Sequence, residues 1–252
     1  MGIEVETRGR VAEVIVDIPP VNALPVRGWF DLAAAVRAAG RDSAVGAVVL
    51  SARGRGFCAG VDIKELSGDG PDKRAALVGV NRGCFEAFAA VYECEVPVIA
   101  AVQGFCLGGG VGLAGNADIV VAADDATFGL PEVDRGALGA ATHLARLVPQ
   151  HLLRAMVYTC RPVTAQQLHA YGSVHAVVTR DELSAAAHDL AATIAAKDPY
   201  IVRRAKESLN GIDPVDVRRS YRFEQGFTYE LTLAGVADAA RAEFTARKDG
   251  AR

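Results

Sequence analysis

Two glycine-rich segments, each directly after a short apolar run, constrain the fold of this chain more than any other feature. Residues 54–65 (GRGFCAGVDIKE) follow the run GAVVLS at 46–51, and residues 103–112 (QGFCLGGGVG) follow VPVIAAV at 96–102. Each pattern indicates a buried strand that turns sharply on glycine and leads into a helix. Such turns leave backbone N–H groups unpaired, and two converging N–H groups form an oxyanion hole. For either segment alone, glycines that simply permit tight packing are an equally good interpretation.

Other apolar runs extend this pattern into a layered α/β fold. Residues 11–18 and 118–122 are typical of strands, and residues 25–39 are typical of a helix with apolar residues at three- or four-residue intervals. Continuous apolar strands that alternate with helices predict a sheet buried on both faces. After about residue 180 we expect helices alone, at 182–197, 200–209, 215–233 and 236–248.

This change of character divides the chain into two predicted regions. Residues 1–195 form the core, and residues 196–252 form a helical region that packs on this core or on a neighbouring subunit. The apolar and aromatic residues of the second region exceed what one helix face buries. This excess suggests a subunit contact, and the residues that form the excess are Tyr221, Phe223, Phe227, Tyr229, Leu231 and Leu233.

Composition excludes several classes of protein. The net charge of −3, from 27 basic and 30 acidic side chains, gives no reason to expect a nucleic-acid or anionic-membrane partner. The most apolar run, 96–102, is too short to span a bilayer, and the charged N-terminus does not resemble a signal peptide. Five cysteines without CxxC spacing, and histidines without HExxH spacing, predict neither disulfides nor a metal site. We therefore expect a cytoplasmic protein.

A third glycine pattern points to a different function. Gly110, Gly112 and Gly115 form GxGxxG after a strand, which is typical of dinucleotide-binding folds. That motif normally opens the first strand–helix unit, however, and here three predicted strands precede it. It also leaves residues 54–65 unexplained. A nucleotide-linked oxidoreductase is therefore disfavoured.

Four segments together resemble the crotonase family, also called the enoyl-CoA hydratase/isomerase superfamily. They are PPVNALP (19–25), GRGFCAGVDIKE (54–65), VPVIAAVQGFCLGGGVGLAGNADIVVA (96–122) and ATFGLPE (126–132), in the family's order and spacing. The resemblance implies a spiral of ββα units with a helical C-terminal trimerisation region. It implies an acyl-CoA thioester substrate, no cofactor apart from the CoA of the substrate, and a homotrimer or dimer of trimers.

The resemblance also implies a site. The oxyanion-hole N–H groups fall on Val61 and Gly109, where they would hold the thioester oxygen as an enolate forms. Lys64 would approach the CoA phosphates, although a solvated surface lysine is the simpler interpretation. The predicted substrate-binding residues are Ala59, Gly60, Asp62, Lys64, Gly108, Gly112, Leu130 and Asp134.

The chain departs from the hydratase pattern at one catalytic position. Hydratases of this family use two glutamates, and here the first position is Gly112 while the second is Glu132. Because adding water to a C=C bond needs both groups, an ordinary hydratase is doubtful. Apolar neighbours would raise the pKa of Glu132 and suit it to general acid–base work, unless it is an exposed loop residue. Gly112, without a side chain, would leave room for a bulky bicyclic acyl group.

The residues after Glu132 are unusual for the family. His143 stands where hydratases have a pocket-wall glycine, so we predict that it lines the pocket as an alternative base, or else is hydrogen-bonded in the core. Asp134 would orient a partner or pair with Arg135. Asp62, beside the oxyanion residue, is usually structural in the family.

Three segments (81–105, 131–156 and 221–238) resemble a steroid-degrading actinobacterial subgroup of the family. This resemblance implies hydrolytic C–C ring opening of a bicyclic indene-dione carboxyl-CoA. Water would attack a ring ketone, and the electrons would flow to the thioester as a dienolate held by the two N–H groups. The alternatives are an enoyl-CoA isomerase or a broad hydratase that uses Glu132 alone, and an acyl-CoA-binding protein without turnover.

Overall fold

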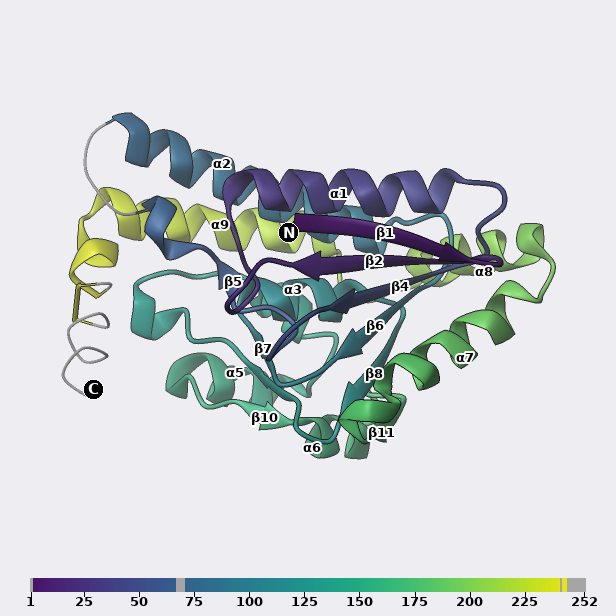
Figure 1. Ribbon diagram of the computed structural model, residues 1–252. Coiled ribbons are helices and arrows are strands. Elements are labelled where there is room, and N and C mark those ends of the chain that lie inside the picture. The colour runs from purple at the N-terminus through teal and green to yellow at the C-terminus, as the bar shows by residue number, and fades with distance from the viewer. Residues whose placement is uncertain (1, 67–70, 241, 244–252) are drawn as a thin grey trace.

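A six-stranded sheet forms the centre of the computed structural model, which describes residues 2–66, 71–240 and 242–243 (Figure 1). The first two strands pair antiparallel, and all later neighbours pair parallel. In spatial order the strands are β1 (Gly2–Arg8), β2 (Val11–Asp17), β4 (Ala47–Ala52), β6 (Val98–Val102), β8 (Ile119–Ala123) and β11 (Ala176–Val178).

Two small sheets extend from one end of the central sheet. One pairs β3 (Ala23–Leu24) with β5 (Gly60–Val61), and the other has the order β10 (Val163–Thr164), β9 (Thr127–Gly129), β7 (Phe105–Leu107). Both glycine-rich segments contribute to them, since β5 lies in the first segment and β7 in the second.

The chain therefore repeats a strand, a short strand and a helix. The repeats are β2–β3–α1, β4–β5–α2, β6–β7–α3 and β8–β9–α4. Their helices are α1 (Val26–Arg41), α2 (Pro71–Tyr92), α3 (Gly109–Asn116) and α4 (Ala141–Leu144), and α5 (Gln150–Thr159) and α6 (Ala165–Ala170) follow. This succession is the spiral of ββα units that the family resemblance implies.

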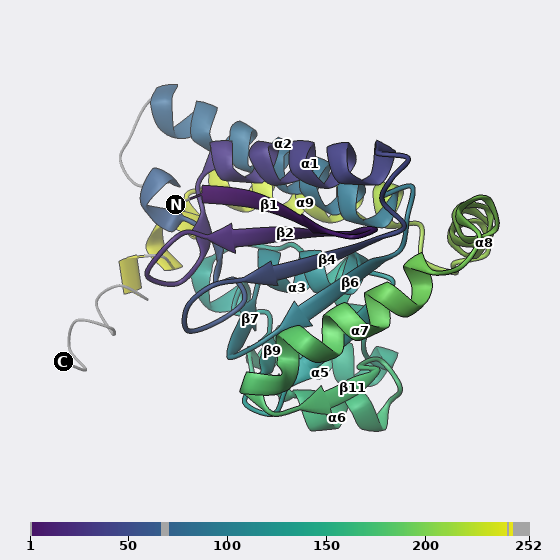
Figure 2. The ribbon, with the colours of Figure 1, turned by 45° about the vertical axis from the view of Figure 1, so that its right-hand side comes forward.

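Helices cover both faces of the central sheet (Figures 1 and 2). Side chains alternate along each strand, so Val48 and Leu50 of β4 join one hydrophobic cluster with α1, α2 and α3, while Ala47 and Val49 join another. The second cluster contains the buried face of α7 (Leu183–Ala195), which crosses the opposite side of the sheet. Burial on both faces explains why these strands are continuously apolar.

The predicted strands and the first helix are confirmed within one or two residues. The C-terminal helices are also confirmed as α7, α8 (Pro199–Gly211) and α9 (Val217–Leu233). Of the segment 236–248, residues 236–240 are helical, while 241 and 244–248 lie outside the described residues. No helix of the described residues is long and apolar enough to cross a membrane.

α9 folds back against the core of its own chain. It packs on α2 and α4, and Tyr221 belongs to the main hydrophobic cluster. Tyr221 is therefore buried by its own chain, and the subunit contact suggested by the apolar excess stays a prediction. Other apolar residues of α9 face outward, among them Phe223, which is 72% exposed, and Leu233, which is 83% exposed. The division of the chain at residue 195 stays a prediction.

Candidate active site

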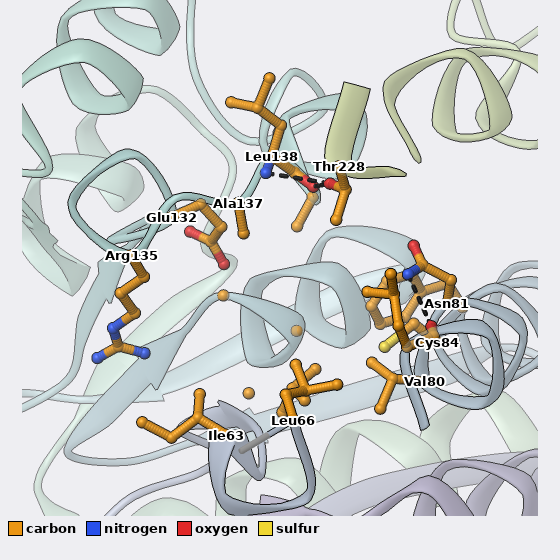
Figure 3. A pocket seen from close by; sticks show the side chains of 18 of the residues that line it. Ile63, Leu66, Val80, Asn81, Cys84, Glu132, Arg135, Ala137, Leu138 and Thr228 are labelled. Atoms are coloured by element: carbon orange, nitrogen blue, oxygen red, sulfur yellow. Dashed lines mark hydrogen bonds between the residues drawn. The ribbon is translucent and has the colours of Figure 1, made fainter. Parts of the chain in front are cut away.

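One cavity lies where the two glycine-rich segments, α2, α9 and the loop after β9 meet (Figure 3). Most of its wall is aliphatic or glycine, and polar side chains enter it from three sides. The lining residues are Ala59, Gly60, Val61, Ile63, Leu66, Leu77, Val80, Asn81, Cys84, Phe88, Gly108, Gly109, Glu132, Arg135, Ala137, Leu138, Gly139, Ala140, Tyr221 and Thr228.

Both predicted oxyanion donors lie in this wall. The Asp62 N–H donates to the Leu24 carbonyl at 2.9 Å, and consecutive N–H groups of a strand point to opposite sides. The Val61 N–H therefore points away from β3. Gly109 is the first residue of α3, and the N–H groups of a first helical turn have no partner within the helix.

Glycine conformations bring the two donors together. Gly60 has φ +88° and Gly108 has φ +56°, which L side chains rarely adopt. A Cβ on Gly60 would lie 3.1 Å from the Gly109 nitrogen, so a larger residue would push the two segments apart. The structure places Val61 and Gly109 beside each other, as an oxyanion hole requires, and their catalytic role stays a prediction.

The Glu132 carboxyl lies directly beside this pair of donors. It follows the buried end of β9, and a Cβ on Gly108 would lie 2.5 Å from Glu132 Oε1. Glu132 Oε2 is shielded from solvent and has no hydrogen-bond partner among the described residues. This burial raises the pKa of Glu132 from 4.5 to about 8, and the positive charge of Arg135 opposes the shift. The exposed-loop interpretation is therefore wrong, and the carboxyl is suited to exchange a proton near neutral pH.

Gly112 does not leave room for an acyl group. A Cβ there would lie 2.3 Å from Cζ of Phe88, so the phenyl ring already fills the space in front of this glycine. Gly112 is also absent from the cavity wall, whereas Phe88 is part of it. The prediction that Gly112 binds substrate is wrong for this reason.

His143 lies behind the cavity wall. Its ring contacts the rings of Phe88 and Tyr221, at centroid distances of 4.7 and 4.8 Å, and both of those residues line the cavity. His143 Nδ1 is 2.9 Å from Asn116 Nδ2. Burial, with the nearby charge of Arg146, lowers the pKa of His143 to about 3, so the ring is neutral at physiological pH. The prediction that His143 lines the pocket is therefore wrong, and the core interpretation holds.

Of the remaining predicted residues, Ala59, Gly60 and Gly108 line the cavity, while four others do not. Leu130 is buried in the core, and the Asp62 carboxylate accepts the Lys64 N–H at 3.0 Å, which is a structural role. Lys64 and Asp134 are exposed. A contact of Lys64 with the CoA phosphates stays a prediction. In the described part of the chain, no three His, Cys, Asp or Glu side chains gather as metal ligands would.

Sequence reasoning missed the polar and aromatic residues that α2, α9 and the loop after β9 contribute. These are Asn81, Cys84, Phe88, Arg135, Tyr221 and Thr228. None belongs to a glycine motif, and only the packing of helices distant in sequence brings them together. For Arg135 alone, the sequence held a feature that could have indicated a place in the site, since it is a charged residue three positions after Glu132.

Comparisons with known proteins agree with this geometry. A sequence profile described as "Enoyl-CoA hydratase/isomerase" matches residues 6–232. A Rhodococcus jostii protein named "(7aS)-7a-methyl-1,5-dioxo-2,3,5,6,7,7a-hexahydro-1H-indene-carboxyl-CoA hydrolase" is 63% identical over 97% of this chain and 94% of its own length. A protein of the same name from Mycobacterium tuberculosis is 62% identical over 93% of this chain and 94% of its own length.

Solved structures have the same fold. An enoyl-CoA hydratase/isomerase from Xanthobacter autotrophicus superposes with a TM-score of 0.87 at 29% identity, over 99% of this chain and 94% of that one. A probable enoyl-CoA hydratase from Mycobacterium thermoresistibile superposes with a TM-score of 0.82 at 30% identity, over 92% of this chain and 97% of that one.

Proposed function

Since the chain belongs to the enoyl-CoA hydratase/isomerase family, the crotonase family, we propose that it hydrolyses a ring carbon–carbon bond in a bicyclic indene-dione carboxyl-CoA thioester of steroid catabolism. The observation that carries this proposal is 63% identity, over 97% of the chain, to a hydrolase named for that substrate. The site supports it independently, because a buried carboxyl lies beside two backbone donors in a mostly apolar cavity.

The proposed reaction proceeds in steps that involve the two backbone N–H donors and the Glu132 carboxyl. The N–H groups of Val61 and Gly109 hold the thioester oxygen, and ionised Glu132 takes a proton from water as its oxygen attacks a ring ketone. The bond between the former ketone carbon and the ring then breaks, and its electron pair moves through the conjugated system to the thioester oxygen. Glu132 returns the proton to the resulting dienolate. One water is consumed, and the ketone carbon becomes a carboxylic acid, which releases the second water proton to solvent as it ionises to the carboxylate.

This route needs one proton-transfer group, in agreement with the single carboxyl beside the donors. Gly112 and Phe88 leave no second carboxyl in the position that a family hydratase uses. The same single carboxyl would also suffice for an enoyl-CoA isomerase, which moves one proton along an allyl system. That activity is the second candidate function.

The proposal also covers the oligomeric state, the cofactor and the cellular location of the protein. We expect a homotrimer or dimer of trimers, supported by exposed apolar residues on α8 and α9 such as Tyr200, Ile201, Phe223 and Leu233. We expect no cofactor apart from the CoA of the substrate. Cytoplasmic location is supported by the five cysteines, which are free thiols.

The test compares two thioesters in ¹⁸O-water: the bicyclic indene-dione carboxyl-CoA and a straight-chain 2-enoyl-CoA. We expect the label in a new carboxylate of the bicyclic ester, detected by mass spectrometry after esterification, with little change in the enoyl ester. Esterification is needed because hydration also adds one water. Rapid hydration or double-bond migration of the enoyl ester, with the bicyclic ester intact, would exclude the proposed function.

A further inference from the structure

Arg135 is the cationic member of the cavity wall. Among the described lining residues, only Glu132 and Arg135 carry a formal charge. Both belong to the same turn, because Arg135 ends the 3-10 helix Val133–Arg135 and its N–H donates to the Glu132 carbonyl at 2.9 Å. Figure 3 shows the charged ends of the two side chains apart, with the Arg135 guanidinium on the side of Ile63, which also lines the cavity. The Glu132 carboxyl lies beside Gly108 instead.

The proposed reaction generates charge on two separate oxygens, and the backbone donors serve only one. The thioester oxygen lies at the Val61 and Gly109 N–H groups. The ketone oxygen, at the other end of the conjugated system, becomes an alkoxide when water adds and a carboxylate oxygen when the ring opens. An anion in a mostly apolar cavity is costly unless a cation or several donors face it. A second electrophilic group is therefore required.

The neutral polar side chains of the wall carry no charge and are held by hydrogen bonds to neighbouring groups. Asn81 Nδ2 donates to the Leu77 carbonyl at 2.9 Å, and the Thr228 hydroxyl is bonded to the Leu138 backbone. The Tyr221 hydroxyl interacts with Gln225 and Cys84. A guanidinium differs from these groups because it has five donors, keeps its charge and matches the two oxygens of a carboxylate.

We propose that Arg135 binds the ring-ketone oxygen that water attacks, stabilises the alkoxide formed there, and pairs with the carboxylate of the ring-opened product. This inference rests on the proposed function and extends it to a second anion site in the same cavity. It makes Arg135 the residue that distinguishes an acyl group with a distal carbonyl from a simple enoyl chain.

The experiment uses Arg135→Met, Arg135→Lys and a control, Arg8→Met, which removes a 66%-exposed arginine from the end of β1. Two properties of each variant are measured. The first is turnover of the bicyclic thioester. The second is affinity for two ligands, the ring-opened carboxylate product and a saturated acyl-CoA without a distal carbonyl. We expect Arg135→Met to lose roughly 10²-fold in kcat, as when one oxyanion donor is removed. It should lose roughly tenfold or more in product affinity, with the saturated ester bound as before. Added guanidinium should restore part of the rate, and Arg135→Lys should be intermediate.

Equal loss of affinity for both ligands, or turnover of Arg135→Met within a few-fold of the wild type, would overturn the inference. Circular dichroism shows whether Arg135→Met is folded. If it is not, the same comparison of product affinity with saturated-ester affinity in Arg135→Lys tests the inference. If the wild-type protein does not open the bicyclic ester, the proposed function fails and the role of Arg135 fails with it. If the wild type opens the ester and Arg135→Met opens it equally well, only the role of Arg135 fails.

Discussion

The Phe88 ring occupies the space that a side chain at residue 112 would need, with Cζ of Phe88 2.3 Å from a Cβ placed on Gly112. The missing hydratase carboxylate is therefore not an empty position. The Phe88 ring of α2 fills it, and the same ring forms part of the cavity wall. With Phe88 in this position, Glu132 is the one carboxyl among the described residues that line the cavity.

Replacing Gly112 with alanine should destabilise the protein. The added methyl group would overlap the buried Phe88 ring, and overpacking of this kind costs about 1–3 kcal/mol. Urea unfolding measures the loss. The matched control is Gly226→Ala in α9, where nothing lies within 4 Å of the new Cβ, so stability should be unchanged or slightly higher. Equal stability of the two variants would show that the Phe88 ring moves aside freely.

Replacing Glu132 with glutamine should abolish ring opening and spare thioester binding. Glutamine preserves the shape beside Gly108 but cannot take a proton from water. We expect kcat to fall at least roughly 10²–10⁴-fold, with the affinity for a saturated acyl-CoA unchanged in calorimetric titration. The control is Glu207→Gln, which changes a glutamate 66% exposed on α8. Normal turnover by Glu132→Gln would remove Glu132 from the mechanism.

The pH dependence of the reaction should report the state of Glu132. Its pKa is raised to about 8, so the carboxyl of the free enzyme is mostly neutral at pH 7 and ionised above pH 8. A general base acts in the ionised form, so kcat/KM should rise up to tenfold per pH unit below 8 and level off above it. Arg135 lowers this pKa, and the profile of Arg135→Met should therefore move to higher pH. A rate that falls through pH 8 would instead identify the neutral carboxyl as an acid.

The parts of the site that sequence predicts are those determined by neighbouring residues. The turns at Gly60 and Gly108 follow apolar strands and have backbone conformations that glycine adopts easily, so their geometry is largely local. Glu132 was identified by its family motif, and its apolar neighbours predicted the direction of its pKa shift. These features do not depend on which distant helix covers them.

The parts that sequence does not predict depend on packing between distant segments. Ala140 has φ +65°, so α4 begins only at Ala141 and residues 137–140 form a loop on the cavity wall. His143 is consequently turned inward, toward Asn116. A continuous helix over 137–148 would present these residues differently. Tyr221 reaches the cavity from α9, which lies far along the chain from residues 137–140, and no local pattern distinguishes that position from an exposed one.

Replacing Glu224 with alanine should loosen the cavity wall. Glu224 of α9 accepts the N–H groups of Ala141 and Thr142 at 2.9 and 3.1 Å, and so caps the helix that follows the loop 137–140. Losing such a cap costs about 0.5–2 kcal/mol. We expect KM for the bicyclic ester to rise more than kcat falls, together with a lower urea midpoint. Glu230→Ala, at an exposed position of the same helix, is the control. An unchanged KM would show that the loop holds its shape without the cap.

Replacing His143 with phenylalanine should change the acid stability of the protein more than its activity. Burial holds the pKa of His143 at about 3, below its ordinary 6.5, so the unfolded chain binds a proton that the folded chain excludes. Wild-type stability is therefore lost as pH falls from 6.5 toward 3, by up to about 1.4 kcal/mol per pH unit. The phenylalanine variant cannot bind this proton in the unfolded state, so its unfolding free energy should fall less steeply over this range. His151→Phe is the exposed control.

The same variant should keep its activity. Because His143 lies behind Phe88 and Tyr221, kcat should stay within a few-fold of the wild type. A loss of turnover as large as that of Glu132→Gln, in a variant that remains folded, would return His143 to the list of candidate bases.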